Sequence, residues 1–427
     1  MMEKNNREVS VLSSYVTRKT PGDTSWFTAS RFGMFIHWGL YAMPARHEWV
    51  KTRERIPEEK YDKYFKYFDP DLYDPRDWAR RAKAAGMKYA VLTTKHHEGF
   101  CMFDSQYTDY KCTNTPAGRD LVREYVDAFR AEGLHVGFYY SLIDWHHPSF
   151  PIDHLHPRRD DANARELNEG RDMHVYAEYM RNQVRELLTN YGPIYTLFWD
   201  IPPRYEDPSL NALARRLQPG ILINDRGYDA GDFSTPERSV PEGSRFERMT
   251  EACDSVGEQS WGYRENEDYH TPRYLMSAID KIMAMGGSYL LNVGPMADGR
   301  IPDEAARIVR RVGDWYTRMN GALEDTLPDP FDYQIPANPV IALTKAGKTY
   351  LHFYKGLTST AVTLRACPKI PRAVRLLNNA QFLPFEETAL PNHFDQHGRA
   401  LGPVLHIHHI PAESLDSEPL VLEIEWE

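Results

Sequence analysis

The sequence predicts a (β/α)8-like barrel of the TIM type with an irregular section, followed by a small C-terminal antiparallel β-sandwich. Three observations favour this architecture. As far as about residue 330, short apolar runs alternate with amphipathic helical stretches, which is typical of a parallel sheet with crossover helices. These runs contain few polar residues, as expected of strands covered on both faces. After residue 330 the helical stretches stop, and short strands separated by turn residues follow.

The first half of the barrel contains three predicted strands with helices between them. Apolar and β-branched runs place these strands at 33–37, 88–94 and 134–141. A helix is expected over 74–86, because Asp74 can act as its N-cap and Pro75 suits its first turn. A second helix over 120–132 follows from an apolar stripe on one helical face.

The second half of the barrel is less regular. Helices are predicted over 171–190, 210–217, 271–285 and 303–320. Strands are predicted at 195–199, 221–224 and 288–293, with a poorly patterned one at 246–250. Seven strands are one short of a complete barrel, so an irregular section is expected. A doubly wound open sheet is the alternative.

Residues 331–427 are predicted to form a domain separate from a catalytic barrel of residues 1–330. The predicted strands of this second domain are 348–354, 360–366, 373–377, 404–410 and 420–426. No helical stripe lies between them, which favours an antiparallel sandwich. The expected linker is the proline-rich stretch 327–339.

Composition excludes several classes of protein. The 427 residues carry a formal charge of −10, which is a poor match for nucleic acid or an anionic membrane surface. No apolar run approaches the roughly 20 residues that a membrane-spanning helix needs. The polar N-terminus shows no secretory signal, and the four cysteines form no CxxC pair. We therefore expect reduced thiols and a cytoplasmic protein.

Polar side chains follow each predicted barrel strand. They are His37, His96 and His97, Ser141 and Asp144, Asp200, Asn224 and Asp225, Glu251, and Asn292. In a parallel barrel the carboxyl ends of the strands meet at one mouth, where enzymes of this fold keep their active sites. The sequence therefore predicts an active site at this mouth.

Two carboxylates indicate the chemistry of that site. Asp200 directly follows the apolar run YTLFW, and Glu251 follows the poorly patterned strand. A carboxylate at the end of a buried strand is either an ion-pair partner or a catalytic group. Together the two match the pair used in glycoside hydrolysis. The 9 Trp, 26 Tyr and 18 Phe residues fit a sugar site as well as an ordinary core.

Patterns for other chemistries are absent or poor. HExxH, GxSxG and the Walker pattern do not occur in the sequence. His96 and His97 point apart if the chain is extended, so hydrogen bonding to sugar hydroxyls is at least as good a use for them as metal ligation. His406, His408 and His409 lie along one predicted strand. We interpret them as surface or interface residues, with metal binding as the less favoured alternative.

Five segments within the first 330 residues carry a family resemblance. They are RFGMFIHWGLYAMPARHEWV (31–50), MKYAVLTTKHHEGFCMFDS (87–105), YGPIYTLFWD (191–200), SWGYRENE (260–267) and GGSYLLNVGPMADGRIP (286–302). In this order they resemble the α-L-fucosidases of glycoside hydrolase family 29 over nearly all of this region. Two departures stand out: Glu98 replaces the usual Asp after the double histidine, and Ile-Pro-Pro follows Asp200 in place of a turn containing Gly.

The resemblance implies catalytic roles for two carboxylates. Asp200 matches the nucleophile of the family. Glu251 matches the general acid/base, and Glu237, Glu242 and Glu247 are its alternatives. The implied mechanism is double displacement, in which Asp200 attacks the anomeric carbon and the acid/base protonates the leaving oxygen.

The resemblance also implies which residues hold the sugar. The expected contacts with the fucose ring and hydroxyls are His37, Glu48, Trp49, His96, His97 and Tyr140, with Phe198 as a stacking ring. An arginine between the nucleophile and the acid/base is expected too. Arg238 is the first choice for it and Arg226 the alternative.

The function implied is that of a retaining exo-α-L-fucosidase acting on a fucosylated oligosaccharide or glycoconjugate. No metal, cofactor, nucleic acid or membrane partner is expected, and a homo-oligomer is left open. The alternatives are a transfucosylase, a glycosidase for a related sugar, a metal-assisted hydrolase using His96, His97 and Asp200, or a catalytically silent sugar-binding relative. The presence of two candidate carboxylates argues against the silent relative.

Overall fold

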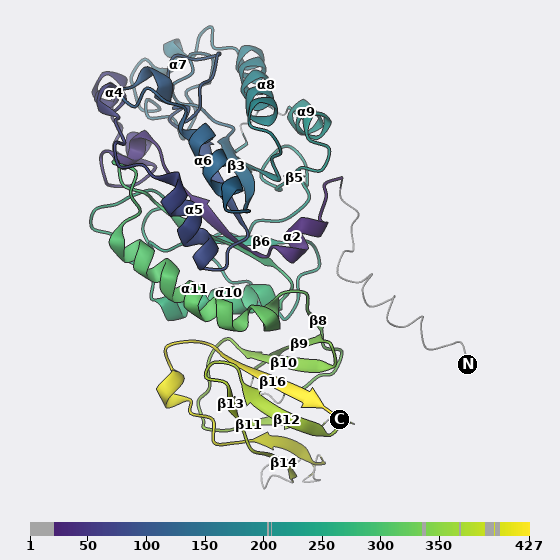
Figure 1. Ribbon diagram of the computed structural model, residues 1–427. Coiled ribbons are helices and arrows are strands. Elements are labelled where there is room, and N and C mark those ends of the chain that lie inside the picture. The colour runs from purple at the N-terminus through teal and green to yellow at the C-terminus, as the bar shows by residue number, and fades with distance from the viewer. Residues whose placement is uncertain are drawn as a thin grey trace.

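The structure is a computed structural model that describes residues 21–202, 205, 207–334, 339–366, 369–388, 397 and 402–427. Helices surround a parallel sheet in the upper part of Figure 1, and the strands of the C-terminal residues form the lower part. This arrangement confirms the predicted barrel-like fold followed by antiparallel sheets.

Among the described residues, the barrel sheet has seven strands, all paired in parallel. They are β1 (Phe32–Ile36), β2 (Tyr89–Lys95), β3 (His135–Ser141), β4 (Thr196–Asp200), β5 (Leu222–Ile223), β6 (Glu251–Ser255) and β7 (Ser288–Val293). Their spatial order is β5-β4-β3-β2-β1-β7-β6. Since every pair is parallel, all carboxyl ends lie at the same mouth, as predicted.

An irregular segment connects the two outer strands, β5 and β6. Isolated parallel bridges span this gap and join Asn224 to Phe233, Ser234 to Thr250, and Glu237 to Cys253. Residues 233–237 thus occupy the place of an eighth strand without forming a regular one. The irregular section expected from the count of seven strands lies here.

The long helices cover the outside of the barrel (Figure 1). They are α5 (Pro75–Ala84), α6 (Leu121–Ala131), α8 (Met173–Asn190), α9 (Ser209–Leu217), α10 (Pro272–Ala284) and α11 (Asp303–Leu323). The other helices of the described residues are α2 (Ser25–Ala29), α3 (Val50–Arg53), α4 (Glu58–Tyr67), α7 (Ala164–Leu167), and the 3₁₀ turns η1 (Leu40–Ala42), η2 (Cys112–Asn114) and η3 (Glu413–Leu415). Asp74 caps α5 as predicted, because its carboxylate accepts hydrogen bonds from the amides of Arg76 and Asp77. Within the described ranges, no helix is both long and apolar enough to cross a membrane.

Side chains that alternate along the strands divide the core into two layers. The inner cluster fills the barrel, and α2 packs against its amino-terminal end through Trp26 and Phe27, which contact Tyr89. The outer cluster lies between the strands and the surrounding helices. This alternation decides which residue of each strand faces the barrel interior.

The C-terminal strands form two antiparallel sheets in the part of the chain that the structure describes. Their bounds are β8 (Leu327–Pro328), β9 (Ile341–Lys345), β10 (Lys348–Phe353), β11 (Val362–Arg365), β12 (Pro371–Leu376), β13 (Gln381–Phe382), β14 (Phe385–Thr388), β15 (Val404–Ile407) and β16 (Leu420–Trp426). One sheet has the order β13-β12-β16-β10-β9-β8, and the other has the order β11-β15-β14. A shared apolar cluster lies between them.

Two differences from the predicted elements matter. The strand expected at 246–250 is wrong, because β6 begins at Glu251. Within the expected linker, β8 already pairs with β9, while residues 335–338 lie outside the described residues. The domain boundary at residue 330 stays a prediction.

Candidate active site

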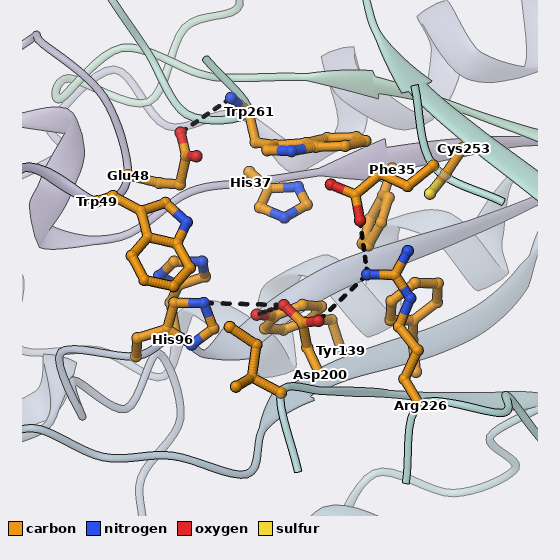
Figure 2. Close-up of a pocket in the computed structure, with 14 residues that line it drawn as sticks. Phe35, His37, Glu48, Trp49, His96, Tyr139, Asp200, Arg226, Cys253 and Trp261 are labelled. Carbon is orange, nitrogen blue, oxygen red and sulfur yellow. Dashed lines mark hydrogen bonds and ion pairs between the residues drawn. The ribbon is translucent and has the colours of Figure 1, made fainter. Parts of the chain in front are cut away.

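A cavity of about 190 Å³ opens at the carboxyl ends of the barrel strands. Figure 2 shows the residues that line it: Phe35, His37, Glu48, Trp49, His96, His97, Tyr139, Phe198, Asp200, Ile201, Arg226, Glu237, Cys253 and Trp261. Pockets for drug-sized ligands typically measure about 300–1,000 Å³. This cavity therefore suits a smaller polar ligand.

Asp200 ends β4 and lines the cavity. Its Oδ2 accepts a hydrogen bond from the Tyr139 hydroxyl at 2.7 Å and lies 3.8 Å from His97 Nε2. Its Oδ1 accepts one from Arg226 Nη1 at 3.3 Å. The hydroxyl and the guanidinium stabilise a negative charge on this carboxylate, and its side chain is 17% exposed. An accessible carboxylate at the mouth of the barrel can act as a nucleophile.

Arg226 joins Asp200 to a second carboxylate. The same Nη1 atom lies 2.7 Å from Glu237 Oε2. Glu237 ends the irregular segment 233–237, and its side chain is 37% exposed. Asp200 Oδ1 and Glu237 Oε2 both contact this nitrogen, so the distance between the two oxygens is at most the sum of the two contact distances. The structure thus brings Asp200 together with Glu237, which the sequence had left as one of several candidates for the acid/base.

Glu251, the first choice for the general acid/base, does not line this cavity. It begins β6 and pairs with Ser288, which begins β7, so it lies at the amino ends of the strands, opposite the mouth. It is fully buried there and accepts a hydrogen bond from the Tyr89 hydroxyl. Burial raises the pKa of Glu251 to about 7. The structure therefore places Glu251 away from the cavity, because the residue begins its strand and does not follow it.

Glu242 and Glu247 also lie outside the cavity wall. Glu242 is an exposed residue whose Oε2 lies 3.5 Å from Lys281 Nζ on α10. Glu247 is likewise exposed, in the loop that leads into β6. Glu237 is therefore the one of the four candidate glutamates that lines the cavity with Asp200.

His37 is held as a neutral hydrogen-bond acceptor. Asn292 Nδ2 donates to the Trp261 carbonyl at 2.7 Å, so Asn292 Oδ1 faces His37 Nδ1, also at 2.7 Å. His37 Nδ1 must then carry the proton. Burial and the neighbouring His96 lower the pKa of His37 to about 3. Its Nε2 is therefore left with a lone pair that can accept a hydrogen bond from a ligand hydroxyl.

His97 has the same tautomer for a similar reason. Ser141 Oγ donates to the Ile143 carbonyl at 2.7 Å, so it accepts from His97 Nδ1 at 2.8 Å. Burial, with His96 adjacent, lowers the pKa of His97 well below its usual range. The unprotonated Nε2 lies 3.8 Å from Asp200 Oδ2, too far for a direct hydrogen bond. A ligand hydroxyl near these two atoms can donate to either of them.

Glu48 fixes the loop that carries Trp261. Its Oε2 accepts hydrogen bonds from Ser260 Oγ at 2.8 Å and from the amides of Trp261 and Gly262 at 2.9 and 3.1 Å. Burial alone would raise the pKa of Glu48, but the backbone amides and the Ser260 hydroxyl together lower it. The result is a buried carboxylate at the cavity wall, which can accept hydrogen bonds from a ligand.

Aromatic rings supply the apolar part of the cavity. Phe35 lies between Phe198 and Trp261, with ring centroids 5.1 and 6.1 Å away. Trp49 packs on His97, with centroids 4.6 Å apart. The cavity therefore combines hydrogen-bonding groups with an apolar surface for a methyl group or a ring face.

Tyr140 does not line the cavity, although it was predicted to contact the sugar. Side chains alternate along β3, so Tyr139 faces the barrel interior and Tyr140 faces the outer helices. There the Tyr140 hydroxyl donates to Gln183 Oε1 of α8 at 2.7 Å. The structure therefore places Tyr139 at the cavity wall in place of Tyr140.

Arg238 does not line the cavity but lies behind Trp261, which does. Its guanidinium packs on the Trp261 ring, 4.6 Å from the ring centroid. Its Nη1 donates to the Glu258 carbonyl at 2.9 Å. Arg238 therefore supports Trp261, and Arg226, the second choice, is the arginine that contacts both carboxylates.

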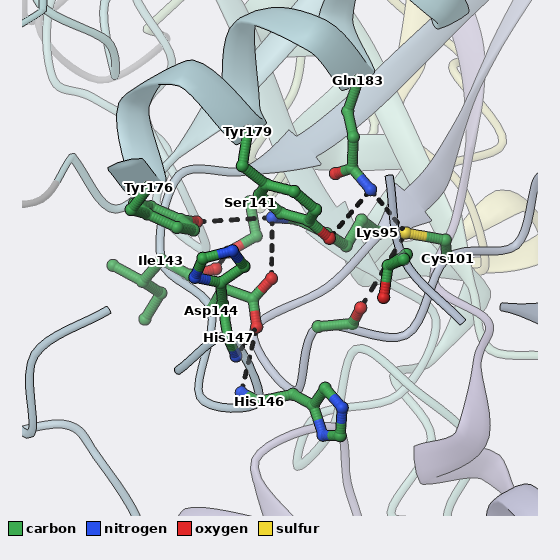
Figure 3. A network of polar contacts seen from close by, with 12 residues as sticks. Lys95, Cys101, Ser141, Ile143, Asp144, His146, His147, Tyr176, Tyr179 and Gln183 are labelled. Atoms are coloured by element: carbon green, nitrogen blue, oxygen red, sulfur yellow. Dashed lines mark hydrogen bonds and ion pairs between the residues drawn. The ribbon is translucent and has the colours of Figure 1, made fainter. Parts of the chain in front are cut away.

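Lys95, which directly precedes the double histidine in the chain, forms a buried ion pair with Asp144. Figure 3 shows this pair. Lys95 ends β2, and its Nζ lies 3.2 Å from Asp144 Oδ2, with both side chains almost fully buried. Asp144 Oδ1 accepts hydrogen bonds from the amides of His146 and His147, each at 2.9 Å. The pair thus ties the end of β2 to the loop after β3.

Sequence reasoning missed several cavity residues. Phe35, Tyr139 and Cys253 lie on the strands, while Ile201 and Trp261 lie in the loops that follow them. The period-2 pattern carried a signal for the strand residues. Since His37 faces the cavity, Phe35 does too, and Tyr139 lies on the face opposite Tyr140.

Comparison with known proteins agrees with this geometry. A family model described as Alpha-L-fucosidase matches residues 4–322. The human tissue alpha-L-fucosidase is 27% identical over 360 residues, which cover 77% of this chain and 75% of that protein. The structure of alpha-L-fucosidase isoenzyme 1 from Paenibacillus thiaminolyticus is 40% identical, with a TM-score of 0.83 over 95% of this chain and 98% of that chain. The Thermotoga maritima alpha-fucosidase, solved with a mechanism-based inhibitor, is 27% identical, with a TM-score of 0.74 over 93% and 96%. The chain belongs to the α-L-fucosidase family.

Proposed function

We propose that the protein is a retaining exo-α-L-fucosidase, which removes a terminal α-L-fucosyl group from an oligosaccharide or glycoconjugate. The pairing of Asp200 and Glu237 through Arg226 carries the proposal. Carboxyl groups lie about 5–5.5 Å apart in retaining glycosidases and about 6.5–9.5 Å apart in inverting ones. The contacts with the shared Arg226 nitrogen limit the distance between Asp200 Oδ1 and Glu237 Oε2 to less than the separation in inverting enzymes. This limit supports retention.

The mechanism assigns one role to each carboxylate. In the first step Asp200 bonds to the anomeric carbon while the glycosidic C–O bond breaks, and Glu237 gives its proton to the leaving oxygen. In the second step Glu237, now ionised, takes a proton from water. The water oxygen bonds to the anomeric carbon and displaces Asp200. The product is α-L-fucose, and both carboxyl groups return to their starting states.

The cavity supports recognition of a terminal 6-deoxy sugar. His37 and His97 each offer an unprotonated Nε2 to the sugar hydroxyls, and Glu48 offers a carboxylate. Leaving such a group unpaired costs about 1–3 kcal/mol, which is how the site would reject a sugar with a different hydroxyl arrangement. Phe35 and Trp261 offer an apolar surface to the methyl group at C5. The small cavity volume supports exo action.

Azide rescue of two variants tests both roles in one experiment. With an aryl α-L-fucoside as substrate, Asp200→Ala should lower kcat by about 10⁴-fold or more. Azide should restore part of this activity and give β-L-fucosyl azide, because it enters where Asp200 attacks. Azide with Glu237→Ala should give α-L-fucosyl azide, because it attacks the covalent intermediate from the opposite face. Product configuration is read by proton NMR.

Glu251→Gln is the matched control for the acid/base, because Glu251 was the rival candidate. This variant should hydrolyse the aryl fucoside at close to the wild-type rate. If Glu251→Gln were inactive while folded and Glu237→Ala were not, the assignment of Glu237 would be wrong. If the wild type released β-L-fucose first, retention would be wrong.

A cytoplasmic location stays a prediction.

A further inference from the structure

The outer face of the small C-terminal sheet carries a cluster of metal-ligand side chains, remote in the chain from the barrel cavity. His406 on β15 lies directly opposite Glu386 on β14 in the strand register. His408 lies just after the end of β15, and its ring stacks on that of His406. One ligand atom of each of these three residues lies within 4.8 Å of the others.

The core packing of the sheet does not account for this outward-facing cluster, in which His408 Nδ1 also lies 2.5 Å from His409 Nδ1. Leu405 and Ile407 are the β15 residues that point into the sandwich core, so the intervening His406 faces outward. His406 Nδ1 lies 3.8 Å from Glu386 Oε1, which is longer than a hydrogen bond. The His406 and His408 rings are nearly parallel, with centroids 5.2 Å apart. A loose ion pair at such an exposed place contributes little to stability.

The donor set matches a transition-metal ion. Imidazole nitrogens and carboxylate oxygens bind Zn²⁺ at about 2.0–2.2 Å, so ligand atoms around the ion lie about 3.3–3.5 Å apart in a tetrahedral site. Glu386 is the most exposed member, with 61% of its side chain accessible, and His406 is 27% accessible. Small rotations of such side chains close the remaining distance without moving the strands.

We propose that Glu386, His406 and His408 bind one Zn²⁺ ion, which bridges β14 and β15. Because β14 pairs with β15 alone among the described residues, the ion would stabilise this side of the sandwich. Two histidines and one carboxylate leave a fourth coordination position for water. The catalytic carboxylates take no part, so the proposal is independent of the proposed function.

Zinc titration of untagged, chelator-treated full-length protein tests the proposal. Calorimetry should give one Zn²⁺ per chain with a dissociation constant in the micromolar range or tighter. The melting temperature should rise with added zinc, because the ion binds the folded state. Glu386→Gln, His406→Ala and His408→Ala should each weaken binding by about tenfold or more. Cobalt(II) absorption gives a second readout that reports the ligand set directly.

Two control variants separate this site from nonspecific binding. Glu387→Gln changes the same residue type at the next position of β14, which points to the other face. His154→Ala removes an exposed histidine of the barrel part. Both should bind zinc as the wild type does. Binding that is absent from the wild type, or unchanged in all three site variants, would overturn the proposal. Hydrolysis of the aryl fucoside by each variant verifies that it is folded.

Discussion

Glu237 and Glu251 show how surroundings decide what a carboxyl group can do. Glu237 contacts Arg226 and is partly exposed, so it can exchange protons with a ligand and with water. Glu251 is fully buried, and its Oε1 has no hydrogen-bond partner among the described residues. Burial raises the pKa of Glu251 to about 7. A raised pKa is also typical of a general acid, but Glu251 has no access to a substrate.

The raised pKa of Glu251 predicts a pH-dependent stability. The ordinary pKa of this group is 4.5, so the folded state holds the proton more tightly than the unfolded chain does. The resulting stabilisation is complete below pH 4.5 and is lost as the pH rises through about 7. Glu251→Gln cannot ionise. Relative to the wild type, it should therefore gain up to about 3 kcal/mol in unfolding free energy between pH 4.5 and 8.

Urea unfolding of both proteins across this pH range measures the difference. Glu59→Gln, which changes an exposed glutamate of α4, is the control and should follow the wild type at every pH. Parallel curves for Glu251→Gln and the wild type would contradict the raised pKa.

Ile201 carries backbone strain directly beside the proposed nucleophile. Its φ is 47°, in the left-handed region that a β-branched residue rarely adopts, and its side chain lines the cavity. We expect Ile201→Gly to be more stable than Ile201→Ala by about 1 kcal/mol, because glycine has no Cβ to strain. Both variants remove the same apolar contact, so their comparison isolates the backbone. Thermal unfolding measures it, and an alanine variant of equal or greater stability would rule out the strain.

Among the secondary-structure elements, regular strands were predicted well from the sequence and irregular ones poorly. Strands β1 to β4 and β7 match predicted runs, because they consist mostly of buried apolar residues. Strand β6 reads EACDS and contains three buried polar residues, which a hydrophobic pattern does not detect. Residues 233–237 pair only through isolated bridges and contain Pro236. A register that depends on long-range pairing cannot be read from local composition.

The site residues were likewise predicted well on regular strands and poorly on irregular segments. The residues that line the cavity as predicted either end a regular strand or belong to a recognisable motif: His37, Glu48, Trp49, His96, His97, Phe198 and Asp200. Glu237 was not the first choice, because its position depends on the irregular segment. Tyr140 was named in place of Tyr139, because the period-2 pattern shows that the two side chains lie on opposite faces of β3 but not which of them faces the cavity.

The ion pair between β2 and the loop after β3 is expected to stabilise the packing of these two elements. Lys95 and Asp144 are an almost fully buried ion pair, and removing one partner leaves the other charge uncompensated. Lys95→Met should lower the unfolding free energy by about 3–5 kcal/mol. Lys95→Met with Asp144→Asn should cost less than the two single changes added together. A double-mutant cycle by urea unfolding measures this coupling, and strict additivity would contradict it.

The six-stranded sheet lies between the hydrophobic core of the barrel and that of the sandwich. Ile341 and Tyr350 of the six-stranded sheet belong to the apolar cluster of the barrel. Leu351 and Phe353 point to the other face and belong to the cluster of the sandwich. Because both faces of β10 are buried, the barrel and the sandwich are expected to unfold as one cooperative unit.

A buried polar contact crosses the same junction. His352 Nδ1 on β10 lies 2.8 Å from Asp280 Oδ1 on α10, and its Nε2 donates to the Ala322 carbonyl of α11 at 3.1 Å. Neither side chain of the pair is exposed. His352→Ala leaves Asp280 without this partner inside the protein, so it should lower the unfolding free energy by about 3–5 kcal/mol.

Calorimetry of the full chain tests the contribution of His352 to the junction. The melting temperature of His352→Ala should fall, while that of His154→Ala, which changes an exposed histidine, should not. Because apolar residues of both parts still pack on the sheet, the variant should keep a single transition. Replacing both members, as in His352→Phe with Asp280→Leu, should recover part of the loss, since no buried carboxylate is left unpaired. A fall of less than about 1 kcal/mol in His352→Ala would show that the apolar contacts alone hold the two parts together.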